Sequence, residues 1–137
     1  MENFNRYFLH QRTVFLENIS YETPEKPLIP RENYKLGCKD TLVAQLSQNG
    51  IKVSFNRALN FEGGGPYSLS VTFSCIMPFD PSTKDEVDWK NTDIAGEFRK
   101  NCPDVMANLM SRTSLLISQI TSSYGQPPLI TPAAPKK

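Results

Sequence analysis

Residues 101–124 read NCPDVMANLMSRTSLLISQITSSY, and this stretch decides how the rest of the chain is arranged. Its apolar side chains recur at a helical spacing, at Val105, Met106, Leu109, Met110, Leu116, Ile117, Ile120 and Tyr124. That spacing predicts a long helix with one apolar stripe against a core. Pro103 suits the first helical turn, whereas Gly125 and Pro127 end the helix.

The opposite face of this helix is poor in charge, because only Asp104 and Arg112 are ionised within the stretch. Small uncharged side chains occupy that face instead, and they permit the close approach of a second helix. We therefore expect an oligomer interface there, and the alternative is a serine-rich helix exposed to solvent. The residues assigned to the interface are Ser111, Ser114, Ser118 and Thr121.

Four segments read as β-strands. Residues 13–22 are rich in β-forming side chains, with an irregularity expected near Glu17 and Asn18, and a second strand is clearest over 41–48. Asn49-Gly50 is a strong hairpin signal, since both residues tolerate a positive φ. Segments 51–61 and 67–77 alternate apolar and polar side chains, and Arg57 is the one break in the first of these apolar faces.

The pattern predicts an α+β fold, in which a four-stranded antiparallel sheet has one face covered by the long C-terminal helix. A short helix is expected over 91–100, capped by Asp93 or Thr92. The length of 137 residues fits one domain over 1–137, with an irregular N-terminus at 1–12 and a Pro-rich tail at 125–137.

Composition excludes several classes of protein. A net charge of +1 argues against charge-driven nucleic-acid binding. The three cysteines are widely spaced and form no C-x-x-C motif, so neither a disulfide framework nor a zinc site is expected. With no signal peptide and no apolar run of membrane-spanning length, we expect a cytoplasmic protein that does not insert into membranes.

No catalytic constellation is present in the sequence. His10 is the only histidine and lies in an ordinary N-terminal segment. Cys102 at a helix start is interpreted as a packed thiol, and the acidic run Asp85, Glu86 and Asp88 as a solvated loop. We therefore expect a protein without enzymatic activity, cofactor or metal ion.

Residues 23–33 form a Pro-rich connection that excludes both a helix and a central strand. This connection carries two large apolar side chains, Leu28 and Ile29. Exposure of such residues needs a functional reason, and the alternative is that they attach the loop to the core.

Several motifs together resemble the SecB family of export chaperones, over about residues 12–132. Ile19-Ser20-Tyr21-Glu22, followed by Pro24 and Pro27, is similar to the first strand and crossover of that family. Cys102-Pro103 resembles the start of its main helix, and Gly125-Gln126-Pro127-Pro128-Leu129 with Pro132 resembles the loop that follows. The Asn49-Gly50 hairpin and the glycine loop match its sheet in order.

The resemblance implies a homotetramer, a dimer of dimers, that holds unfolded polypeptides without ATP. It implies a client groove built from the crossover loop and the loop after the main helix. On this sequence the client-binding residues are Leu28, Ile29, Tyr34, Tyr124, Pro128, Leu129 and Ile130.

This sequence also departs from the family pattern. It lacks the Pro-Tyr-Ala-Arg run near 108–111, an acidic docking surface on the sheet, and a final helix with an acidic tail. We therefore expect weak binding, or none, to the translocase ATPase. The function expected is that of a holdase chaperone, in preprotein export or with other clients. The alternative is an interaction or regulatory module for one protein partner, for example in a toxin–antitoxin system.

Overall fold

The computed structural model describes residues 1, 3–24, 35–123 and 128–135. Its strands are β1 (Thr13–Glu22), β2 (Leu36–Leu46), β3 (Gly50–Phe61) and β4 (Ser68–Pro78). Its helices are α1 (Ile94–Asn101) and α2 (Pro103–Ser123), and short 3-10 turns occur at Phe4–Tyr7, Lys84–Glu86 and Trp89–Asn91. These elements confirm the predicted α+β fold with a four-stranded antiparallel sheet.

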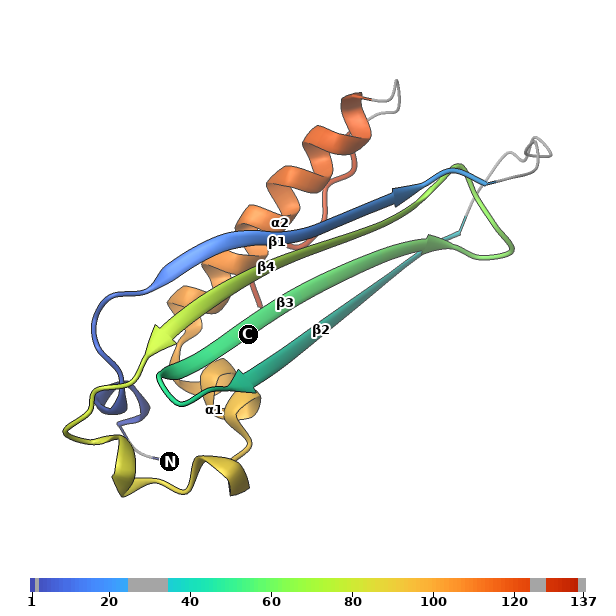
Figure 1. The fold of residues 1–137 in the computed structure, drawn as a ribbon. Coiled ribbons are helices and arrows are strands. Elements are labelled where there is room, and N and C mark those ends of the chain that lie inside the picture. Colours follow the sequence, from blue (N-terminus) through green and yellow to red (C-terminus); the bar gives the residue numbers. More distant parts are fainter. Residues whose placement is uncertain (2, 25–34, 124–127, 136–137) are drawn as a thin grey trace.

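The strands lie in the order β1-β4-β3-β2 (Figure 1). Strands β2, β3 and β4 form the expected meander, whereas β1 pairs with β4 on the far side. Strands β1 and β2 follow one another in the sequence, yet they form opposite edges of the sheet. Within the described residues, each of these two edge strands therefore has one pairing partner.

The irregularity expected near Glu17 is confirmed as a shift in register between Leu16 and Asn18. The Glu17 carboxylate accepts hydrogen bonds from Lys52 and from the hydroxyl of Ser74, the latter at 2.5 Å. Those two hydrogen bonds lower the pKa of Glu17 from its ordinary value. The bulge thus turns an edge-strand carboxylate onto the polar side of the sheet.

The hairpin differs from its prediction in the role of Gly50. Leu46 pairs with Ile51, and Ser47 donates to the carbonyl of Gly50 at 2.9 Å, so residues 48 and 49 form the turn. Gly50 already belongs to β3, and a Cβ atom there would lie 2.4 Å from the carbonyl oxygen of Met77. Close approach to β4 therefore requires this glycine, rather than the positive φ that the Asn-Gly signal suggested.

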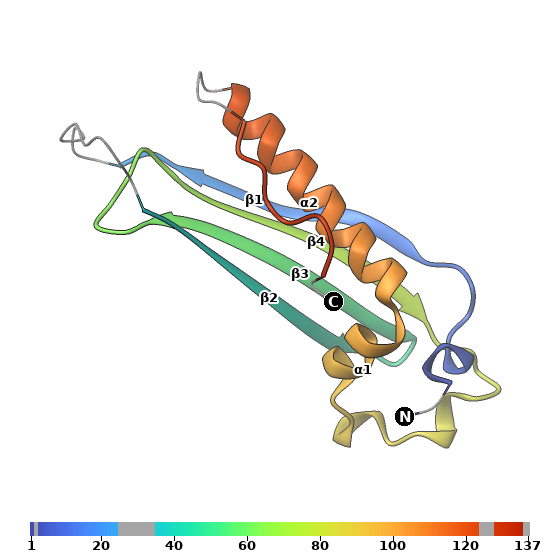
Figure 2. The same ribbon diagram turned by 180° about the vertical axis from the view of Figure 1, so that it is seen from behind.

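Helix α2 covers one face of the sheet, here called the inner face (Figures 1 and 2). That face carries the alternating apolar side chains of β3 and β4, and the opposite, outer face carries mostly Ser, Thr and Asn. The largest fully buried apolar side chains include Phe55, Leu59, Met77 and Leu109. The predicted alternation of the strands is confirmed, including the place of Arg57 on the inner face.

The buried stripe of α2 only partly follows the prediction. Met106, Leu109, Met110 and Ile117 are buried as expected, whereas Leu116 and Ile120 are only half-buried. Polar residues are buried in their place, namely Thr113, Ser114 and Thr121. Leu115, in the middle of the outward face, is 60% exposed. The stripe is rotated because a second segment of the chain covers α2, as described below.

The end of the sheet near the N-terminus is closed by an aromatic cluster. Phe4 and Phe8 pack on Trp89, and the Phe8 ring stacks on Phe79 with centroids 5.3 Å apart. The N-terminal residues, expected to be irregular, thus contribute a 3-10 turn to the core. Helix α1 begins as predicted, with the Asp93 carboxylate accepting from the N–H of Gly96 at 3.2 Å. Among the described residues, no helix combines the length and apolarity needed to cross a bilayer.

Candidate peptide-binding site

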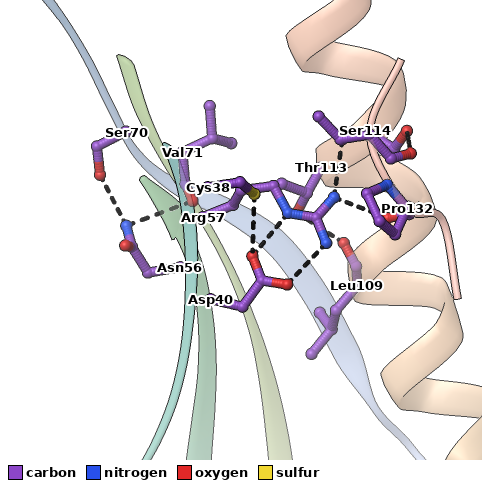
Figure 3. A network of polar contacts seen from close by, with 11 residues as sticks. Cys38, Asp40, Asn56, Arg57, Ser70, Val71, Leu109, Thr113, Ser114 and Pro132 are labelled. Atoms are coloured by element: carbon purple, nitrogen blue, oxygen red, sulfur yellow. Dashed lines mark hydrogen bonds and ion pairs between the residues drawn. The ribbon is translucent and has the colours of Figure 1, made fainter. Parts of the chain in front are cut away.

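Arg57 is the centre of a polar network on the inner face (Figure 3). Its side chain has 0% exposure, although it lies in the middle of an apolar strand face. The β2–β3 register places Asp40 directly opposite, and the guanidinium donates to both carboxylate oxygens at 2.7 and 2.9 Å. A buried cation needs such a partner, because desolvation without one is very costly.

The remaining guanidinium donors of Arg57 hold residues 128–135, here called the C-terminal segment. Nη1 donates to the Thr131 hydroxyl at 2.8 Å and to the carbonyl oxygen of Pro132 at 2.7 Å. Figure 2 shows this segment running back beside α2, over the inner face of the sheet. The guanidinium therefore ties β2 to a segment that lies more than seventy residues later in the chain.

Helix α2 also forms hydrogen bonds with the C-terminal segment. The Ser114 hydroxyl donates to the carbonyl oxygen of Thr131 at 2.7 Å, and the Thr121 hydroxyl accepts from the N–H of Leu129 at 2.9 Å. Thr131 is buried as a result, whereas Ile130 is 78% exposed. Burial of Ser114 and Thr121 is thus explained by these bonds within the chain.

An open apolar groove continues from the end of the C-terminal segment towards α1. Its volume is about 190 Å³. The groove is lined by Asp40, Thr41, Leu42, Phe55, Arg99, Met106, Met110 and Pro135. Flexible methionine side chains beside an aromatic floor suit apolar ligands of varied shape. The groove is therefore chemically suited to apolar side chains from another polypeptide.

The three described members of the predicted client groove lie together in the C-terminal segment. Pro128 and Ile130 are exposed, and Leu129 is half-buried against the core. The other predicted members, Leu28, Ile29, Tyr34 and Tyr124, lie outside the described residues. The grouping of all seven into one groove stays a prediction.

The four residues predicted to form an oligomer interface on α2 differ in their exposure. Ser111 is exposed and Ser118 is half-buried, so both remain accessible to a second subunit. Ser114 and Thr121 are covered by the chain's own C-terminal segment. The structure describes a single chain, so an oligomer interface on α2 stays a prediction.

Sequence reasoning missed the pairing of Arg57 with Asp40. Arg57 itself was visible as the one charged residue on an apolar strand face, which signals a buried partner. Asp40 lies on the inner face of β2, but the alternation of β2 is weak, and its partner depends on the exact hairpin register. Cys38, two positions earlier, is also on this face; it is exposed, and partial desolvation raises the pKa of its thiol.

Comparison with known proteins gives one informative result. No family model matches the sequence, and no curated protein matches it. Among solved structures, the Mycobacterium tuberculosis Rv1957 SecB-like chaperone, in complex with a ChAD peptide from the Rv1956 HigA1 antitoxin, has a similar fold. The TM-score is 0.61 at 10% sequence identity, with 88% of this chain and 86% of the mycobacterial chain covered.

The chain has the fold of the SecB-like chaperones. At this identity the similarity establishes the architecture: a four-stranded antiparallel sheet with a long C-terminal helix on one face. It agrees with the resemblance found in the sequence motifs, which was drawn from other features of the chain.

Proposed function

We propose that this protein is an ATP-independent holdase, which binds extended, apolar segments of unfolded polypeptides. The observation that carries this proposal is the open groove of Phe55, Leu42, Met106 and Met110, beside Pro135 at the end of the C-terminal segment. An unfolded chain would gain about 25 cal/mol for each Å² of apolar surface that it buries there. Such a site needs no nucleotide, because binding is driven by burial alone.

We further propose that the protein acts as a cytoplasmic homotetramer, with α2 at the interface between subunits. Leu115 supports this proposal, because a large aliphatic side chain with 60% exposure lies between Ser111 and Ser118 on a helix face with little charge. Several grooves in one oligomer would give avidity for long clients, even where each groove binds weakly. Work in preprotein export remains within this proposal, with weak translocase binding expected.

A second function is an interaction module for one protein partner, as in a toxin–antitoxin system. The mycobacterial chaperone of similar fold was solved with a peptide from an antitoxin. In this chain, the hydroxyl and guanidinium groups of Ser114, Thr121 and Arg57 are suited to one particular backbone path. A single-partner module would ignore unfolded proteins in general and bind only one sequence tightly.

Suppression of aggregation tests the holdase proposal. A chemically denatured protein that aggregates during refolding is diluted into buffer with and without this chain, and light scattering is followed. We expect suppression without ATP, at a ratio set by the oligomer. Unchanged aggregation at a molar excess of the chain would contradict the holdase and favour the single-partner module.

A further inference from the structure

We propose that the surface around Arg57, between β3 and α2, is a peptide-binding site that continues into the open groove beside Pro135. Its resident ligand is the chain's own C-terminal segment, and incoming clients displace this segment. This proposal rests on the proposed function, because it takes unfolded polypeptides as the ligands that compete with the segment. It also specifies the ligand: an extended peptide with a small hydroxyl side chain facing Arg57 and main-chain carbonyls beside it.

The C-terminal segment is bound as an extended peptide is bound. Over residues 129–132 its side chains alternate between the protein surface and solvent, since Leu129 and Thr131 are covered while Ile130 and Pro132 are exposed. This alternation is the period of an extended strand. The segment nevertheless belongs to no strand of the sheet, so side chains hold it in place of a ladder of backbone hydrogen bonds.

Most of the contacts recognise the main chain of the segment. Thr121 accepts from one N–H group, while Ser114 and Arg57 donate to two carbonyl oxygens, all at 2.7–2.9 Å. Main-chain groups of this kind are present in every extended polypeptide. The groove can therefore accept foreign segments that follow the same path.

One contact recognises a side chain of the segment. The Thr131 hydroxyl accepts a hydrogen bond from Nη1 of Arg57 at 2.8 Å, inside the buried part of the site. An aliphatic residue at this position would leave that donor facing a methyl group, at the cost of an unsatisfied buried N–H. The site should therefore prefer serine or threonine there, and the buried cation disfavours lysine or arginine.

Displacement is physically reasonable because the site is only partly filled. The groove beyond Pro135 stays open over about 190 Å³, so a client can engage Phe55 and Met110 before it replaces the segment. The tether gives the C-terminal segment an effective concentration in the millimolar range. Clients that span several grooves can exceed this advantage, whereas a single short peptide cannot.

A labelled synthetic peptide of residues 128–135, PLITPAAP, is the probe for this proposal. Fluorescence anisotropy compares its affinity for the full chain and for a chain that ends at Pro127, whose fold is checked by circular dichroism. We expect the shortened chain to bind the peptide at least about tenfold more tightly, because its groove is vacant. We also expect reduced, carboxymethylated lactalbumin to compete with the bound peptide.

Two peptide variants test the contacts without any change to the protein. The Thr131→Val peptide should bind about tenfold more weakly, because it leaves the Arg57 donor unsatisfied. The matched Ile130→Ser peptide should bind as the parent does, since that side chain points away from the groove. Equal binding of the parent and Thr131→Val peptides would overturn the claim that Arg57 recognises the hydroxyl group of the ligand.

A full-length variant covers the case in which the shortened chain does not fold. Thr131→Val in the full chain loosens the C-terminal segment but keeps every residue that lines the groove. It should bind the parent peptide several-fold more tightly than the native chain does, whereas the control Thr13→Val, on the outer face of β1, should not. No gain in the Thr131→Val chain would overturn the proposal.

These experiments distinguish failure of the holdase proposal from failure of the proposal that clients displace the C-terminal segment. Lactalbumin that binds without displacing the peptide would overturn the shared site and leave the holdase proposal standing. Failure of lactalbumin to bind any form of the chain would contradict the holdase proposal, while the peptide measurements still decide whether the groove is a peptide site.

Discussion

The carboxylate of Asp40 on β2 accepts two hydrogen bonds from the guanidinium of Arg57 on β3, at 2.7 and 2.9 Å. Arg57 is completely buried, whereas the side chain of Asp40 is 39% exposed. The pair therefore places one buried cation inside the apolar face of the sheet and supplies its counter-charge from the edge strand. The same guanidinium holds the C-terminal segment, so Arg57 contributes both to the stability of the fold and to the proposed binding site.

Asp40→Asn should destabilise the protein by about 2 kcal/mol, because a buried guanidinium then lacks a counter-charge while it keeps one amide acceptor. Urea unfolding followed by the fluorescence of Trp89, the single tryptophan, measures this change. The control is Glu62→Gln, which breaks the exposed 3.8 Å pair with Lys35 and should change stability by less than about 0.5 kcal/mol. Equal effects of the two substitutions would show that burial of Arg57 does not set the energy of the pair.

Stability should fall in acid partly through Glu17. Hydrogen bonds from Lys52 and Ser74 lower the folded-state pKa of Glu17 below its ordinary value of 4.5. A group whose pKa is depressed by folding stabilises the protein above its unfolded pKa, and that contribution is lost as the pH falls through the folded pKa. Unfolding free energies measured between neutral pH and acid should therefore fall less steeply for Glu17→Gln than for the native chain, and parallel curves would contradict this assignment.

The sequence predicted the parts of the fold that depend on local periodicity. The bounds of β1 were predicted correctly as residues 13–22, and so was the irregularity at Glu17. Both follow from β-forming composition and alternation, which are properties of consecutive residues. The cap of α1 at Asp93 was found for the same reason, because capping depends on spacing within one turn.

The missed features depend on contacts between distant segments. Ser114 and Thr121 were assigned to a subunit interface because their helix face carries little charge, which is also what burial within one chain requires. Within the chain they form hydrogen bonds with Thr131 and Leu129, which lie 17 and 8 residues further along, and their part in a subunit interface stays a prediction. Periodicity cannot show that a Pro-rich tail returns along the helix, although hydroxyl groups, each able to donate and to accept, are consistent with such a partner.

Leu115→Glu should reduce the oligomer to a smaller species without loss of fold. The side chain is 60% exposed in one subunit, so a charge there costs little unless a second subunit covers it. Light scattering coupled to size exclusion measures the mass of each species. Thr13→Glu, on the outer face of the sheet, is the matched control and should keep the native mass. A native chain that is monomeric at micromolar concentration would contradict the proposed interface.

Leu42→Ser should weaken client binding, because Leu42 is a half-buried aliphatic side chain that lines the open groove. The control is Val43→Ser, which removes the neighbouring aliphatic side chain of β2 from the outer face and should leave client binding unchanged. Aggregation suppression and urea unfolding of both variants check these expectations. Equal loss of protection in the two variants would indicate that clients do not select the inner face.

The most direct test of the holdase account compares two forms of one protein as ligands. Native, disulfide-bonded lactalbumin and its reduced, carboxymethylated form share a sequence, but only the second is permanently unfolded. Fluorescence anisotropy titrations with the full-length chain, without nucleotide, should show binding of the unfolded form and none of the native form. Absence of binding to the unfolded form, or equal binding to both, would contradict the account.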